Sequence, residues 1–148
     1  MNRLKNAYLD SNVFVYAILY KGELAKKAEE YLRKASDGEF VAFTSSLTWD
    51  EVVYAVRKVA GVEKSIEVGK LMLRIPFLKF LEVNHAVCEE AQKLIEKYKL
   101  MPRDAIHAAL ALKYCDGVIV SNDRDFDLIK GLEREYFNWV CKMRDENA

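Results

Sequence analysis

The sequence predicts an α/β protein of three layers, in which helices cover both faces of a mostly parallel central sheet. Short apolar runs that suit buried strands alternate with longer segments of helical periodicity along the chain. Strands that alternate with helices favour right-handed crossover connections and therefore parallel strands. We find no internal repeat, low-complexity stretch or linker, so a single domain over residues 1–148 is expected.

The segment over residues 6–19 predicts a strand, a tight turn and a helix. The short buried strand ends at Asp10, and Ser11 or Asn12 is a suitable N-cap for the apolar helix that follows. The Asp10 carboxylate is therefore expected at the C-terminal tip of the first strand. Ligands bind at this edge of open parallel sheets.

Helix start and stop signals define the remaining elements. Ser45, Ser46 and Thr48 are competing N-caps for one helix. Gly61 is the expected C′ residue of that helix, and Asn84 is the expected N-cap of a later one. The predicted helices cover about residues 23–35, 46–60, 62–73, 85–98 and 102–114, the predicted strands cover 40–44, 77–83, 118–120 and a weak 132–137, and 121–127 is a loop or a short helix.

The composition, with 51% hydrophobic and 31% charged residues, is typical of a soluble globular protein. The 23 Lys and Arg residues balance the 23 Asp and Glu residues, so a nucleic-acid partner would need a local basic face. No apolar run suits a signal peptide or a membrane span, because residues 10–12 interrupt the first one. We expect a cytoplasmic protein without a membrane partner.

The three cysteines, Cys88, Cys115 and Cys141, are widely spaced and form no CxxC pair. This pattern argues against a disulfide framework or a zinc site and suits a reducing compartment. Cys88 and Cys115 are expected to be buried apolar thiols, and Cys141 is expected to be exposed near a polar tail.

Four acidic side chains are all predicted to lie at the C-terminal edge of the sheet. Asp10 and Asp123 follow two parallel strands directly, whereas Glu51 and Asp104 lie in the early turns of helices that begin at the same edge. A plainer interpretation assigns the two helical acids to the helix dipole, Asp10 to a turn and Asp123 to a solvated loop. Apolar neighbours around the acids favour convergence in one cleft.

Clustered carboxylates repel one another and raise each other's pKa values unless a cation neutralises them. Mg²⁺ takes oxygen ligands, retains water molecules and pairs with substrate phosphate. Such ions activate water and stabilise the leaving oxygen in phosphodiester hydrolysis. The predicted cluster therefore indicates metal-dependent hydrolysis of a phosphodiester.

Four segments, in this order and across nearly the whole chain, resemble the PIN-domain family, and most closely its VapC-type toxin ribonucleases. They are YLDSNV at residues 8–13, SLTWDEV at 46–52, PRDAIHAA at 102–109 and VSNDRDF at 120–126. The resemblance implies a three-layer PIN-like fold and an endoribonuclease that depends on Mg²⁺ or Mn²⁺. It also implies a homodimer, an RNA substrate and a small antitoxin protein as partner.

The family's acidic quartet matches Asp10, Glu51, Asp104 and Asp123, and the resemblance implies that Asp10, Asp104 and Asp123 are the metal ligands. Ser121 stands where the family often has Thr and keeps the hydroxyl. Asp125 matches an additional acid whose importance varies within the family. Asp50 and Asp127 match no catalytic position.

His107 lies three residues after Asp104 on the same helix face. We interpret it as a buried, hydrogen-bonded histidine in preference to a general base. Arg103 and Arg124 are candidates for phosphate contacts. Four aromatic residues can stack on bases or belong to the core or a dimer interface: Tyr16, Tyr20, Trp49 and Tyr54. A solvated basic helix face is expected at Lys26, Lys27, Arg33 and Lys34.

Other classes fit less well. A haloacid-dehalogenase-type phosphatase requires a second Asp where Asn12 stands. A response-regulator receiver requires an acid pair, but Leu9 precedes Asp10. A Rossmann domain requires a Gly-rich first turn, which this sequence lacks. A housekeeping nuclease that processes ribosomal RNA and a catalytically silent RNA- or protein-binding module stay open. Apolar stripes over residues 24–32 and 52–56 suggest a two-fold symmetric dimer.

Overall fold

The computed structural model describes residues 4–135, and their five strands form one sheet in the order β3-β2-β1-β4-β5. Every pairing in this sheet is parallel. The predicted α/β class is therefore confirmed, and the sheet is parallel throughout. The strands are β1 (Asn6–Leu9), β2 (Val41–Ser45), β3 (Leu78–Leu81), β4 (Val118–Val120) and β5 (Glu133–Glu135).

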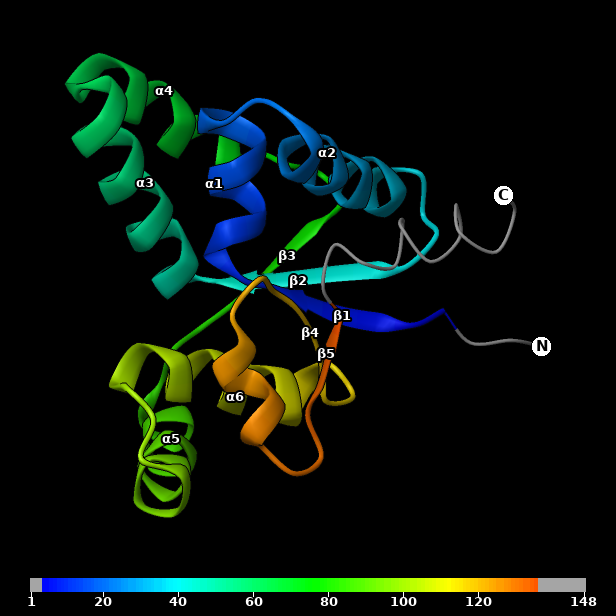
Figure 1. The fold of residues 1–148 in the computed structure, drawn as a ribbon, viewed down its shortest axis with the longest axis vertical. Helices are drawn as coiled ribbons and strands as arrows, with labels where there is room; N and C mark the ends of the chain where they lie inside the picture. Colours follow the sequence, from blue (N-terminus) through cyan, green and yellow to red (C-terminus); the bar gives the residue numbers. More distant parts are fainter. Residues whose placement is uncertain (1–3, 136–148) are drawn as a thin grey trace.

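Within residues 4–135, six α-helices cover the two faces of the sheet (Figure 1). Four helices pack on one face: α1 (Ser11–Leu19), α2 (Glu23–Ser36), α3 (Ser46–Ala60) and α4 (Val62–Leu73). The other two pack on the opposite face: α5 (His85–Tyr98) and α6 (Pro102–Tyr114). A short 3₁₀ helix, η1 (Arg124–Leu128), follows β4. The molecule has the three expected layers.

The alternation of side chains along β1 explains why both faces of the sheet are buried. Ala7 and Leu9 join the core under α1–α4, whereas Tyr8 between them joins the core under α5 and α6. Strand β4 repeats the pattern, because Ile119 points opposite to its two valine neighbours. The two central strands are thus fixed from both sides, and so are the residues that follow their C-terminal ends.

The capping residues agree with the predicted helix boundaries except at α1. Asn84 caps α5 by accepting a 3.0 Å hydrogen bond from the backbone N–H of Val87, and Gly61 ends α3 with φ at 93°. The N-cap of α1 is Asp10, not Ser11 or Asn12, because its carboxylate accepts a 2.8 Å hydrogen bond from the backbone N–H of Ser11. This bond ties a candidate ligand to the helix that begins beside it.

Two burial predictions are wrong. Cys88 lies on the solvent face of α5 and is exposed, whereas Cys115 is buried as expected. Lys34 does not belong to a solvated basic face, because α2 turns it towards the sheet, where it is only 8% exposed. Cys141 and the predicted continuation of the last strand to residue 137 lie outside the described residues.

The apolar stripes that suggested a dimer are covered within the chain itself. Ala28 and Tyr31 of α2 and Val52 and Val56 of α3 are buried in the core under α1–α4. Other apolar side chains of the α3–α4 hairpin are exposed, and they include Ile66 at 48% exposure. In the part of the chain that the structure describes, no helix has both the length and the apolar character that a membrane crossing requires.

Candidate metal centre

The strand order reverses at β1, which has β2 on one side and β4 on the other. In open α/β sheets, ligands bind outside the carboxyl ends of the strands at this reversal. Asp10 follows β1, and Ser121 and Asp123 follow β4. The topology therefore places these side chains where such a fold binds its ligands.

Asp10 is 5% exposed, and further hydrogen bonds besides the Ser11 cap hold its backbone and its carboxylate. Its backbone N–H donates to the carbonyl of Val120 at 3.1 Å, which joins the two strand ends. The Ser121 hydroxyl donates to the carboxylate at 2.7 Å, and the Asn12 side-chain amide donates to it at 3.3 Å. The predicted importance of the hydroxyl at position 121 thus has a structural reason, since it orients this carboxylate.

His107 joins Asp10 to Glu51 and completes what we call the inner cluster, Asp10, Glu51 and His107. The imidazole is 1% exposed, and its Nε2 hydrogen-bonds the Glu51 carboxylate and lies 3.6 Å from Asp10 Oδ1. Its Nδ1 hydrogen-bonds the Tyr8 hydroxyl at 2.7 Å. The expected buried, hydrogen-bonded histidine is confirmed, and its ring bridges β1, α3 and α6.

The Tyr8 hydroxyl is itself fixed by buried partners. It lies 2.8 Å from the Ser45 hydroxyl and 3.2 Å from the Thr48 hydroxyl, at the start of α3. Among residues 4–135, every buried side-chain polar atom has a hydrogen-bond partner, so this network is complete. Sequence reasoning missed it, although the sequence shows that Tyr8 lies two residues before Asp10 and alternates with Ala7 and Leu9 across the strand.

A second group, Asp104, Asp123 and Asp125, forms the outer cluster, in which carboxylate oxygens lie within 4.8 Å of one another. Asp104 stands in the first turn of α6. Asp123 caps η1 by accepting a 2.9 Å hydrogen bond from the backbone N–H of Asp125. The Ser121 hydroxyl also accepts a 3.0 Å hydrogen bond from the backbone N–H of Asp123, which links the outer cluster to Asp10.

Electrostatics shows that the two clusters influence each other. Burial raises the pKa of Asp104 to about 6, and the negative charges of Asp123 and Asp10 add to the shift. Burial also raises the pKa of Asp10 above its usual value, although the charge of His107 opposes this. The site thus concentrates negative charge at the end of the sheet.

His107 is the counter-charge at the inner cluster. Burial lowers its pKa, but the hydrogen bond to Glu51 and the negative charges of Asp10 and Glu51 outweigh burial, so the pKa of the imidazole is raised overall. One imidazolium cannot neutralise all of the carboxylates in the two clusters. A further cation is needed for the ionised form of the site to be favourable.

The residues present fit a hard divalent cation. The outer cluster offers oxygen donors only, which is the ligand type of Mg²⁺ and Mn²⁺, and Asp104 and Asp123 reach it from different elements. The inner cluster also meets the geometric requirement for holding an ion. Its His107 Nε2, however, is already engaged by Glu51.

The structure therefore places the four predicted acids in pairs, Asp10 with Glu51 and Asp104 with Asp123. It also gives Asp125 a place in the outer cluster. Asp127 forms a two-point ion pair with Arg134, at 2.9 and 3.0 Å, which agrees with a structural role. Trp49 donates to the carbonyl of Gly69 at 3.3 Å between α3 and α4, so it belongs to the helix packing.

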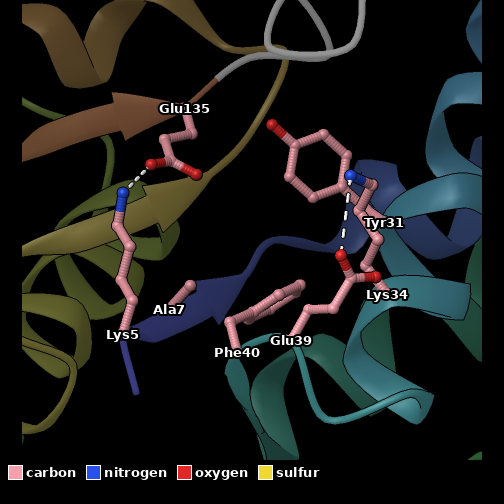
Figure 2. A pocket seen from close by; sticks show the side chains of 7 residues that line it. All are labelled: Lys5, Ala7, Tyr31, Lys34, Glu39, Phe40 and Glu135. Atoms are coloured by element: carbon pink, nitrogen blue, oxygen red, sulfur yellow. Dashed lines mark hydrogen bonds and ion pairs between the residues drawn. The ribbon is translucent and has the colours of Figure 1, made fainter. Parts of the chain in front are cut away.

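A separate hollow of about 180 Å³ lies between the sheet and α2 (Figure 2). Lys5, Ala7 and Phe40 lie at the start of β1 and β2 and line it together with α2 and with Glu135 at the end of β5. Its charged side chains face opposite charges, since Lys5 pairs with Glu135. None of the acids of the inner and outer clusters lines this hollow.

A sequence profile of the PIN domain matches residues 7–132. The chain belongs to the PIN-domain family. Ribonuclease VapC2 of Methanocaldococcus jannaschii is 25% identical to this PIN domain over 149 residues, which span 90% of this chain and 97% of that protein. This PIN domain is thus related to the VapC toxin ribonucleases, as the sequence motifs indicated.

Solved structures show the same fold. VapC20 of Mycobacterium tuberculosis, described as a toxin that cleaves the sarcin–ricin loop, matches with a TM-score of 0.71 and 15% identity over 86% of this chain and 97% of that chain. A chain from a toxin–antitoxin complex of Klebsiella pneumoniae matches with a TM-score of 0.62 and 20% identity over 86% and 95% of the two chains. At these identities the matches establish the PIN-like architecture.

Proposed function

We propose that this protein is an endoribonuclease that depends on Mg²⁺ or Mn²⁺ and hydrolyses RNA phosphodiester bonds. The observation that carries the proposal is the meeting of two acid-rich clusters at the strand-order reversal. One buried histidine is their only cationic member. Such a site is unfavourable until a divalent cation occupies it, and the same cation serves phosphodiester chemistry.

We assign the metal to Asp10, Asp104 and Asp123, directly or through water, with Glu51 completing the catalytic acids. A divalent ion held there would supply an activated water for hydrolysis of the phosphodiester, with a 5′-phosphate and a 3′-hydroxyl as the expected products. Asp10 is aimed by Ser121 and by the helix cap, which fixes the direction of its oxygens. His107 hydrogen-bonds the Glu51 carboxylate through its Nε2 and so holds it in place beside the site.

A toxin within a toxin–antitoxin pair is the biological role that we favour over housekeeping processing of ribosomal RNA. Relationship to VapC2 and structural likeness to a chain of a toxin–antitoxin complex support it. The expected partners are an RNA and a small antitoxin protein, in the cytoplasm, and the whole chain is expected to act as one domain. A catalytically silent module is disfavoured because every acid of the quartet is present.

Expression under an inducible promoter tests this role. Wild-type protein should arrest growth and cut a defined RNA site, and an Asp10→Asn variant expressed to the same level should do neither. Growth arrest that persists in the Asp10→Asn variant would count against toxicity by RNA cleavage. Growth without arrest, combined with metal-dependent cleavage in vitro, would favour a housekeeping nuclease.

We also expect a homodimer with two-fold symmetry. The exposed apolar side chains of the α3–α4 hairpin provide the surface for it, including Val59, Val62 and Leu73, which are 66%, 46% and 60% exposed. Light scattering at micromolar concentration should give twice the chain mass, and a Val59→Glu variant should halve that value. A wild-type protein of monomeric mass would remove this part of the proposal.

A further inference from the structure

A second hollow of about 420 Å³ opens directly beside the inner cluster. It lies between α1, α3 and the start of α6, and Glu51 forms part of both its wall and the inner cluster. Ser11 contributes from the first turn of α1, and Arg103 contributes from the first turn of α6. The volume lies within the range of small-molecule sites, so one nucleotide unit is a plausible occupant by size.

Tyr54 lines this hollow with an aromatic ring that residues 4–135 leave largely exposed. It is 64% exposed and follows Glu51 by three residues on α3, so both side chains lie on the same helix face. Trp49, by contrast, donates to the carbonyl of Gly69 on α4, and the Tyr16 hydroxyl accepts from the side-chain amide of Asn122 after β4. Of the four aromatic residues named from the sequence, Tyr54 is the one that lines this hollow.

Arg103 places a positive charge at the same hollow, next in sequence to Asp104. It is exposed, and within residues 4–135 it has no ion-pair partner, although carboxylates surround the site. A guanidinium in this position matches a phosphate by its planar geometry and charge. The exposed Asp50 on the opposite wall element, α3, repels phosphate and so directs an RNA backbone towards Arg103.

We propose that this hollow binds one unpaired nucleotide next to the bond to be cut, with Tyr54 stacked on its base and Arg103 on its phosphate. The inference rests on the proposed ribonuclease function and adds to it a base-stacking residue and a phosphate-binding residue. A base in a continuous duplex has both faces stacked and cannot meet the tyrosine ring.

The test measures RNA binding separately from cleavage. Each variant is made in an Asp10→Asn background, so that bound RNA stays intact, and is titrated into a fluorescein-labelled RNA stem-loop with an unpaired loop. Tyr54→Ala and Arg103→Ala are compared with Tyr114→Ala at the far end of α6 and Arg57→Ala on α3, which are exposed and lie outside the hollow. Circular dichroism confirms that each variant is folded.

We expect Tyr54→Ala to weaken stem-loop binding at least about fivefold, the lower limit for loss of one stacked base. Arg103→Ala should weaken binding and reduce its salt dependence, whereas the two control variants should bind as their parent does. The same strand annealed to its full complement should bind weakly and without dependence on Tyr54.

Unchanged affinity in both Tyr54→Ala and Arg103→Ala would overturn the nucleotide subsite and would point to a protein segment as the occupant. Cleavage by the enzyme with an intact Asp10 is assayed in parallel. Metal-dependent cleavage with Tyr54-independent binding rejects the subsite alone. Tyr54-dependent binding without any cleavage keeps the subsite and rejects the proposed nuclease.

Discussion

The hollow under α2 and the C-terminal edge of the sheet treat charge in opposite ways. In the hollow each charged side chain faces an opposite charge, as Lys5 faces Glu135 and Lys34 lies 4.0 Å from Glu39 (Figure 2). At the C-terminal edge, carboxylates face carboxylates, and the pKa of Asp104 rises to about 6. The charges of the hollow balance within the chain, whereas the two acid clusters keep an excess of negative charge, as a candidate metal site does.

Strand β1 connects the two regions, because Lys5 precedes it and Asp10 follows it. The same buried strand therefore supports charges that are paired within the chain and charges that repel one another. A fold gains no stability from like charges held together at a strand end. The hollow and the C-terminal edge should therefore respond differently to substitution.

The largest effect is expected from Asp10→Asn, which keeps the shape of the side chain and removes its charge. Cleavage of a labelled RNA in single turnover should fall at least about a hundredfold, or roughly 2.7 kcal/mol in barrier, because metal binding is weakened. Asp127→Asn is the matched control, since Asp127 pairs with Arg134 near the same edge. Equal rates for wild type and Asp10→Asn at limiting metal would contradict the assignment.

His107→Gln should act mainly through stability. The change removes a buried ring that hydrogen-bonds Tyr8 and Glu51, so the free energy of unfolding should fall by about 1–3 kcal/mol. Urea denaturation measures this loss, and cleavage per folded molecule should stay within tenfold of wild type. A folded variant of unchanged stability that cleaves a hundredfold more slowly would instead make His107 a catalytic group.

The pH dependence of the free energy of unfolding should distinguish the repelling carboxylates at the C-terminal edge from the paired charges of the hollow under α2. In the metal-free protein the pKa of Asp104 is raised above its unfolded value of 3.8 to about 6. The folded state therefore binds more protons between these pH values, and this part of the stability is present below about pH 4 and lost as pH rises through 6. The resulting decrease in the free energy of unfolding should be on the order of 1 kcal/mol, after allowance for the solvent exposure of Asp104. The Asp104→Asn variant should not show this decrease.

Thermal unfolding of the metal-free wild type and of Asp104→Asn, from pH 4 to pH 7, gives this comparison. The unfolding temperature of the variant should exceed that of the wild type by a margin that grows as pH rises. A difference that is constant with pH would mean that Asp104 does not titrate abnormally in the folded protein.

The smallest effect is expected in the hollow under α2. Lys5 is half exposed and its pairing with Glu135 is screened by water, so Lys5→Ala should change the free energy of unfolding by less than about 1 kcal/mol. Cleavage should change little. The backbone carbonyl of Glu135 accepts a 3.0 Å hydrogen bond from the backbone N–H of Ser121, so a large loss of activity in Lys5→Ala would show that this ion pair supports the site.

The sequence was sufficient for the order and approximate bounds of the strands and helices, because buried strands and amphipathic helices carry different periodicities. It did not predict that Asp10 itself caps α1, since any of three adjacent polar residues can cap a helix. The burial of Lys34 and Cys88 was predicted wrongly, because the periodicity of a helix does not specify how the helix is rotated against the sheet. The dimer argument failed for the same reason, as neighbouring helices cover the stripes.

The site was predictable in part. Strand ends and helix starts indicated the edge at which Asp10, Glu51, Asp104 and Asp123 lie, since this follows from parallel topology. Their division into two clusters depends on side-chain directions that no sequence pattern specifies. The Tyr8–His107 hydrogen bond joins residues that are 99 positions apart, so it was visible only in three dimensions.

Single-turnover cleavage of a labelled RNA by the wild-type protein, before and after metal removal, tests the central claim most directly. The account predicts cleavage with Mg²⁺ or Mn²⁺, its loss in excess EDTA and its recovery when Mn²⁺ is added beyond the chelator. The thermal unfolding temperature, followed in the same samples, should rise when the metal returns, because the ion binds only the folded state. Full cleavage in EDTA would contradict the claim that the C-terminal edge of the sheet is a metal-dependent nuclease site.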